Sequence, residues 1–124
     1  MIAEAISDLM LALSRYPQDD WIHYEISLTR ALEKRAEDFD TELAIAIEMG
    51  RNMLQGDPSN YFQQMKMVVY EIARSHSIPD LAIDRLPIHH CFELFHDLDD
   101  MAFVLPANVA ARSLMDALRQ RLPG

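Results

Sequence analysis

The sequence predicts an all-α fold, a compact bundle of five to six amphipathic helices forming a single domain over residues 1–124. Three observations support this prediction. Glycine occurs only 3 times and proline 6 times in 124 residues, and so few chain breakers favour long helices over a sheet with many turns. Half of the residues are hydrophobic, which is enough to build the core of one ordinary domain. Apolar residues also recur at helical spacing along most of the chain.

The first helix is expected from about Ile2 to Arg15, because apolar residues recur there at intervals of three and four. Pro17 should end it, since a proline disfavours the helical conformation of the residue before it. The residues expected on its buried face are Ile2, Ala5, Ile6, Leu9, Met10 and Leu13.

The second helix is expected to begin at Asp19 or Asp20, both of which suit an N-cap position. A third helix is expected to follow, with Asp40 or Thr41 as its cap. No glycine or proline separates these two segments, so a single bent helix over residues 20–55, weakest at residues 38–41, is an open alternative.

The next boundary is expected at residues 56–58, where Gly56 suits a left-handed position after a helix, Asp57 a cap and Pro58 the first helical turn. An amphipathic helix should follow to about His76. In the second helix, the residues expected to be buried are Trp21 and Leu28. In the helix that ends near His76, they are Tyr61, Val68 and Ile72.

The C-terminal part is expected to begin with a loop over residues 77–87 that contains one short turn, because two prolines lie there. A helix should run from about Ile88 to Leu98. Residues 99–105 are compatible with an extended buried connection, since their apolar residues lack helical spacing. Pro106 should open the last helix, which is expected to continue to Leu122.

The charge and the cysteine content narrow the class of protein. The formal net charge is −9 and the sequence pI about 4.8, which disfavours nucleic acid and anionic membranes as partners. The one cysteine, Cys91, is expected to be a small core residue. The N-terminal residues lack the features of a secretory signal, and no apolar run approaches the roughly 18 residues of a membrane span. The expected location is the cytoplasm.

The sequence lacks the motifs of the common catalytic sites. With glycine only at positions 50, 56 and 124, no glycine-rich phosphate loop can form. No nucleophile elbow is present, and His90 and Cys91, being adjacent on a helix, cannot face each other. We therefore expect neither an enzyme nor a cofactor.

One polar cluster suggests a different function. His89, Glu93 and His96 lie at i, i+4 and i+7, within about 60° of one another on a helix. Carboxylate and imidazole on one helix face are typical of ligands in metal-binding bundles. A metal-binding helical bundle that uses these three residues is the alternative hypothesis; an ordinary solvent-exposed helix face explains the same pattern.

The leading hypothesis is a small acidic regulator that masks or stabilises a surface of a partner protein, in the manner of an anti-activator, an immunity protein or a chaperone. An acidic surface speeds the capture of a basic partner. Several apolar residues lie off the main helical stripes, which predicts an exposed binding patch and a homodimer formed through it. The residues expected to bind a partner are Ile22, Ile26, Ile45, Met49 and Met53.

Overall fold

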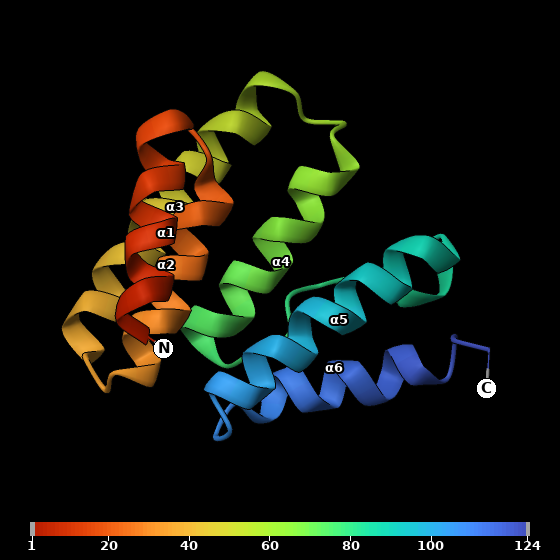
Figure 1. Ribbon diagram of the computed structural model, residues 1–124. Helices are drawn as coiled ribbons and strands as arrows, with labels where there is room; N and C mark the ends of the chain where they lie inside the picture. Colours follow the sequence, from red (N-terminus) through yellow and green to blue (C-terminus); the bar gives the residue numbers. More distant parts are fainter. Residues whose placement is uncertain (1, 124) are drawn as a thin grey trace. The chain divides into compact units, whose positions relative to one another are not determined.

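The protein is all-helical, as its sequence predicts. A computed structural model describes residues 2–123, and this part of the chain contains six α-helices, one short 3-10 helix and no strand. In chain order the elements are α1 (Ile2–Arg15), α2 (Asp20–Leu32), α3 (Ala36–Gly56), α4 (Tyr61–Ser75), η1 (Ile83–Arg85), α5 (Ile88–Val104) and α6 (Val109–Arg119) (Figure 1).

The chain divides into two compact units, the first ending at Tyr70 and the second beginning at Glu71. Helix α4 runs through this boundary, so its first part belongs to unit 1 and its last turn to unit 2. The expectation of one domain over residues 1–124 stays a prediction.

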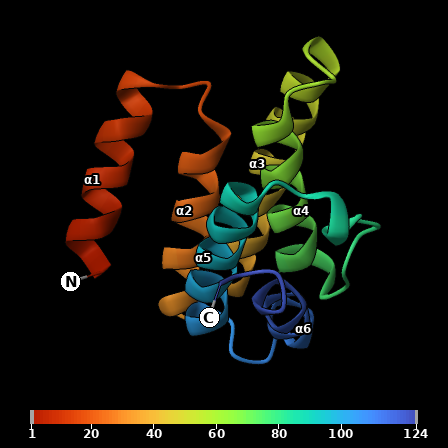
Figure 2. The same ribbon diagram turned by 90° about the vertical axis from the view of Figure 1, so that its right-hand side faces the viewer.

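Unit 1 is built around the pair formed by α2 and α3, and α1 packs beside α2 at the edge of the unit (Figure 2). Its fully or almost fully buried apolar side chains come from α2, α3 and the first part of α4. These are Tyr24, Ile26, Leu28, Leu43, Ala46, Ile47, Val69 and Tyr70.

Helix α1 has the predicted bounds, but the predicted buried face is wrong. None of its residues is buried. Ile6, Leu9 and Leu13 are half-buried, and Met10 is 51% exposed. The apolar spacing therefore identified a helix correctly, but this helix touches the rest of unit 1 on one side only.

The connection between α2 and α3 confirms two separate helices and rules out the alternative of a single bent helix over residues 20–55. Lys34 takes a left-handed conformation with φ of 60°. The N–H of Lys34 donates to the carbonyl oxygen of Ala31, and that of Arg35 to Arg30, both at 3.0 Å. This is the Schellman pattern that normally uses glycine after a helix. Asp40 and Thr41, predicted as caps, lie inside α3 instead.

The boundary between α3 and α4 lies close to the predicted place but uses other residues. Gly56 is the last residue of α3, and no glycine in the described residues has a positive φ. Pro58 lies in a turn, and α4 begins after it, at Tyr61. The cap is Asn60, whose Oδ1 accepts the N–H of Gln63 at 3.1 Å, rather than Asp57.

The predicted core positions are confirmed only in part. Leu28 and Ile72 are buried at 6% and 0% exposure. Trp21 and Val68 are half-buried, and Tyr61 is exposed at 40%. The error arises because α4 turns a face with Gln63 and Tyr70 inward in its first part, so that the apolar residues at its start point outward.

Unit 2 contains the predicted loop with one short turn, η1, followed by α5 and α6, which pack against each other. Helix α5 continues to Val104, so the expected extended connection at residues 99–105 is wrong: Met101 is a buried helical residue. Cys91 is buried, as predicted. The buried apolar side chains of α5 and α6 include Cys91, Leu94, Leu98, Met101, Ala111, Leu114 and Leu118.

Helix α6 begins after Pro106 and is capped by Asn108, which is itself fully buried. The Oδ1 atom of Asn108 accepts the N–H of Ala111 at 3.1 Å, and its Nδ2 donates to the carbonyl oxygen of Ile72 at 2.9 Å. One side chain thus caps α6 and fastens it to the end of α4. The helix ends at Arg119, one turn before the predicted Leu122.

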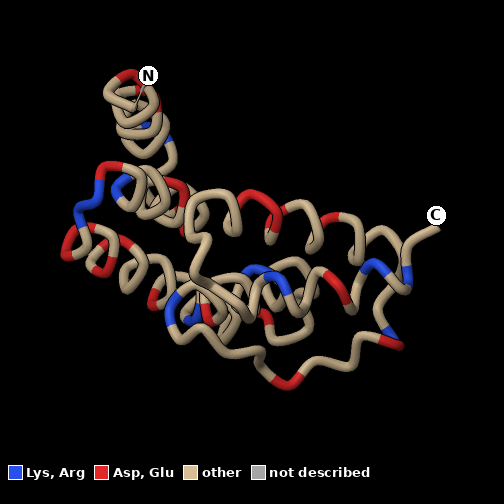
Figure 3. Tube along the Cα trace, turned by 90° about the horizontal axis from the view of Figure 1, so that it is seen from below, with Lys and Arg blue, Asp and Glu red and all other residues tan. Residues whose placement is uncertain are grey.

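Acidic positions outnumber basic ones along the trace (Figure 3), in keeping with the formal net charge of −9. No helix in the described part of the chain has both the length and the apolar character needed to cross a membrane.

Candidate functional site

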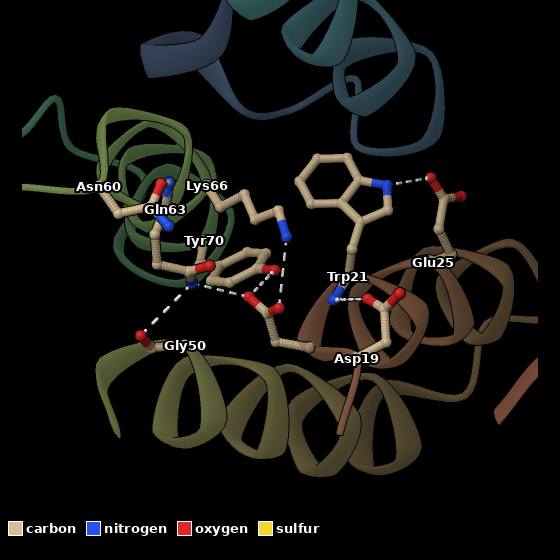
Figure 4. A network of polar contacts seen from close by, with 9 residues as sticks. Asp19, Trp21, Glu25, Gly50, Asn60, Gln63, Lys66 and Tyr70 are labelled. Carbon is tan, nitrogen blue, oxygen red and sulfur yellow. Dashed lines mark hydrogen bonds and ion pairs between the residues drawn. The ribbon is translucent and has the colours of Figure 1, made fainter. Parts of the chain in front are cut away.

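The most distinctive polar site lies in unit 1 around the carboxylate of Asp20, which has no solvent exposure. Its Oδ2 atom accepts hydrogen bonds from the hydroxyl of Tyr70 at 2.7 Å and from Nε2 of Gln63 at 2.9 Å (Figure 4). Its Oδ1 atom lies 3.4 Å from Nζ of Lys66. A buried carboxylate needs such donors, since removal from water without them costs several kcal/mol.

The three donors form one row on α4. Gln63, Lys66 and Tyr70 lie at i, i+3 and i+7, which places them on one side of the helix. Nε2 of Gln63 also lies 3.3 Å from the carbonyl oxygen of Gly50 on α3. Asp20 therefore links the start of α2 to both α3 and α4.

The approach of α3 to this network depends on Gly50. A Cβ atom at this position would lie 2.7 Å from Sδ of Met67, 2.9 Å from Nε2 of Gln63 and 3.1 Å from Oδ2 of Asp20. Any side chain at position 50 would therefore displace the groups that hold Asp20.

An aromatic cluster covers the same network. The ring centroids of Trp21 and Tyr24 are 4.7 Å apart, and that of Tyr70 lies 5.3 Å from Tyr24. Burial, together with the charge of Asp20 and the hydrogen bond to it, raises the pKa of Tyr70 well above its ordinary value. Tyr70 therefore stays a neutral donor to Asp20 over the physiological pH range.

Sequence reasoning identified Asp19 and Asp20 only as alternative caps. Asp19 is the cap, since its Oδ1 atom accepts the N–H of Trp21 at 3.0 Å. The internal role of Asp20 was missed. The available signal was the polar row at positions 63, 66 and 70, which interrupts the apolar pattern of α4.

An open pocket of about 460 Å³ lies next to the network, within unit 1. Lys66 and Asp20 line it on one side, together with Arg15 and Tyr16 from the end of α1 and its connection, and with Met53 of α3. Arg15 makes no ion pair with any residue that the structure describes. The pocket lining therefore contains both signs of charge, with Arg15 and Lys66 beside Asp19 and Asp20, together with the apolar side chain of Met53.

The five predicted partner-binding residues do not share one environment. Ile45 and Met53 are exposed at 36% and 45%, and Ile22 and Met49 are half-buried. Ile26 is buried at 1% exposure and belongs to the core, so it cannot contribute to a surface. Ile45, Met49 and Met53 lie at i, i+4 and i+8, which places them along one side of α3.

The three residues of the metal hypothesis are all on the surface of α5, but the structure does not assemble them into a site. Glu93 lies 3.8 Å from Nδ1 of His90 rather than beside His89, and His96 lies 3.8 Å from Asp100. Among residues 2–123, no group of three His, Cys, Asp or Glu side chains is placed to hold a metal ion. The helical spacing was right, but in the described part of the chain these side chains do not form part of a group that could hold a metal ion.

Comparisons of the chain with protein-family models, with curated proteins and with solved structures gave no match.

Proposed function

We propose that the chain is a small acidic regulator that binds another protein and masks or stabilises a surface of it, in the manner of an anti-activator, an immunity protein or a chaperone. The observation that carries this proposal is the state of α1. This helix has an apolar stripe of six residues, yet none of its residues is buried. Ile6, Leu9 and Leu13 of this stripe are half-buried, whereas Ile2 and Met10 are exposed. An apolar face that its own unit covers only in part is typical of a surface used for binding.

A second apolar surface of unit 1 lies on α3. Ile45 and Met53 are exposed, and Met49 between them is half-buried. Met53 and Arg15 both line the open pocket described above. Flexible methionine side chains suit a surface that adapts to a partner. We name the side of α3 formed by Ile45, Met49 and Met53 the unit 1 patch.

The proposal includes a homodimer that competes with the partner. Two copies can cover the same apolar surface around a two-fold axis, which is the commonest symmetry of protein oligomers. The partner would then displace one copy, so that dimer and complex would be alternative states. A binding protein of this kind needs no catalytic group and no cofactor.

Light scattering over a micromolar concentration range tests the proposal. We expect the unchanged chain to dimerise, and we expect Ile45→Glu or Met49→Glu to weaken the dimer, because a buried unpaired carboxylate is costly. Leu11→Glu is the matched control. Leu11 is 55% exposed and points about 160° away from Leu9 of the apolar stripe. A chain that stays monomeric over the whole concentration range would contradict the dimer. The proposal that the chain masks a partner surface would then lose the support that the dimer gives it.

A further inference from the structure

Helix α5 in unit 2 has a charge composition unlike that of the other helices. Its 17 residues include four acidic side chains and no lysine or arginine. The acidic residues are Glu93, Asp97, Asp99 and Asp100. The inward side of the helix is apolar, with Cys91, Leu94, Leu98 and Met101 at 0–1% exposure. Glu93, Asp99 and Asp100 are exposed on the outer side of the helix, whereas Asp97 is half-buried at the edge of the inward side.

The outer side of α5 also carries large apolar side chains. Ile88, Phe92 and Phe103 are 42%, 49% and 82% exposed. At 100° per residue they fall within an arc of about 60°, and Asp99 lies in the same arc. Fifteen residues separate the first from the last, so the row is about 22 Å long. We name this row, with Asp99 inside it, the α5 face.

The two borders of the α5 face differ. On one border, Glu93, His96 and Asp100 have side-chain exposures of 55%, 77% and 64%. On the other border lies Phe95, whose ring is covered by the guanidinium of Arg119 at 5.3 Å. The face is thus an apolar row with carboxylates inside it and along one of its edges.

We propose that the α5 face binds an amphipathic helix of a partner protein, in which apolar side chains are bordered by lysine or arginine. The apolar side chains of such a helix would cover the two exposed phenylalanines. Its cations would pair with the carboxylates of Asp99, Asp100 and Glu93. Recognition of an amphipathic helix by an apolar surface with complementary charge is a recurrent mode of protein binding.

A second copy of this chain is a poorer occupant of the α5 face. A two-fold contact between two α5 helices would bring six exposed carboxylates together with no lysine or arginine from either helix, since each copy exposes Glu93, Asp99 and Asp100 and has no such cation. Like charges facing each other across an interface oppose association. This surface is therefore separate from the unit 1 patch, and its use does not depend on the dimer proposed above.

Fluorescence anisotropy with the full chain tests the proposal. The probe is a labelled synthetic peptide of about 18 residues, long enough to span the face, with leucine and phenylalanine on one side and lysine and arginine beside them. A control peptide has glutamate in place of every cation. We expect binding of the basic peptide that weakens as the salt concentration rises, and no binding of the acidic one.

Three variants locate the binding. Phe92→Ala combined with Phe103→Ala should weaken binding about tenfold or more, because exposed aromatic anchors carry much of the energy of such interfaces. Asp99→Asn combined with Asp100→Asn should weaken it several-fold and reduce its salt dependence. Val109→Ala, at a residue of α6 that is 69% exposed, is the control and should leave binding unchanged.

Three results would overturn the proposal: equal binding of the two peptides, unchanged binding by the folded double phenylalanine variant, or a dimer of the chain that this variant abolishes. The last result would assign the α5 face to a second copy. Ile45→Glu should bind the basic peptide as the unchanged chain does. This variant therefore distinguishes failure of the peptide-binding proposal from failure of the dimer proposed for the unit 1 patch.

Discussion

Gly50 provides the sharpest test of the packing described for unit 1. Replacing glycine by alanine within a helix ordinarily stabilises a protein by about 0.5–1 kcal/mol, because alanine loses less backbone entropy on folding. At Gly50 the added Cβ would lie 2.7 Å from Sδ of Met67 and 2.9 Å from Nε2 of Gln63. The sulfur atom can move at small cost. The amide of Gln63 cannot move without weakening its hydrogen bond to Asp20.

The expected magnitude follows from these contacts. Forcing a methyl group into a filled site costs about 1–3 kcal/mol, and weakening one hydrogen bond to a buried carboxylate adds about 1 kcal/mol. The higher helix propensity of alanine offsets part of this cost, so Gly50→Ala should lower the free energy of unfolding by about 1–3 kcal/mol. Gly56→Ala is the matched control, since a Cβ atom there meets nothing within 4 Å, and it should raise stability by about 0.4–1 kcal/mol.

Urea unfolding followed by tryptophan fluorescence measures both changes. The single tryptophan, Trp21, lies in unit 1 with its ring centroid 5.9 Å from that of Tyr70, so its emission reports on the unit in which both Gly50 and Gly56 lie. A Gly50→Ala variant as stable as Gly56→Ala would show that α3 does not approach the network as closely as described.

Further outcomes are expected for the core, the tyrosine and the histidines. Ile72→Ala should cost about 2–4 kcal/mol and Val68→Ala clearly less, because Ile72 is fully buried and Val68 only half-buried; equal losses in urea unfolding would contradict this. Since the pKa of Tyr70 is raised in the folded chain, its contribution to stability is complete below the ordinary tyrosine pKa of about 10 and is lost as pH rises above it. Tyr70→Phe should be less stable at neutral pH and should lose part of this alkaline dependence, which a pH series of unfolding curves would show. Elemental analysis should find no stoichiometric metal, and a chelator should leave the helical circular dichroism unchanged; near-unit occupancy removed by His89→Ala or His96→Ala would restore the metal hypothesis.

The helices themselves could be predicted from the sequence, because apolar spacing is a local property of each segment. Their boundaries could be predicted less well. Asp40 and Thr41 resemble caps, but the same residue types also occur on the exposed side of a helix. The real break uses Lys34 in a left-handed conformation, and no preference of lysine indicates such a position. Asp57 was the expected cap, and Asn60 was not predicted; both residue types can cap a helix, and the path of the chain through the turn decides between them.

The Asp20 network could not be predicted, because its partners lie far away in the sequence. Gln63 and Tyr70 follow Asp20 by 43 and 50 residues, so no local pattern connects them. The exposure of the apolar residues of α1 could not be predicted either, for a different reason. Spacing indicated a buried face on α1, but whether a face is covered depends on neighbours that the sequence of the helix does not specify.

The short connection between α2 and α3 has a consequence for the order of folding. Only residues 33–35 join these two helices, and closing so short a loop costs little chain entropy. The donors from α4 reach Asp20 only after a much longer segment has been ordered. We therefore expect the α2–α3 hairpin to be largely formed in the transition state for folding of unit 1. Substitutions of its buried residues, such as Ala46, should slow folding, whereas Tyr70→Phe should mainly accelerate unfolding.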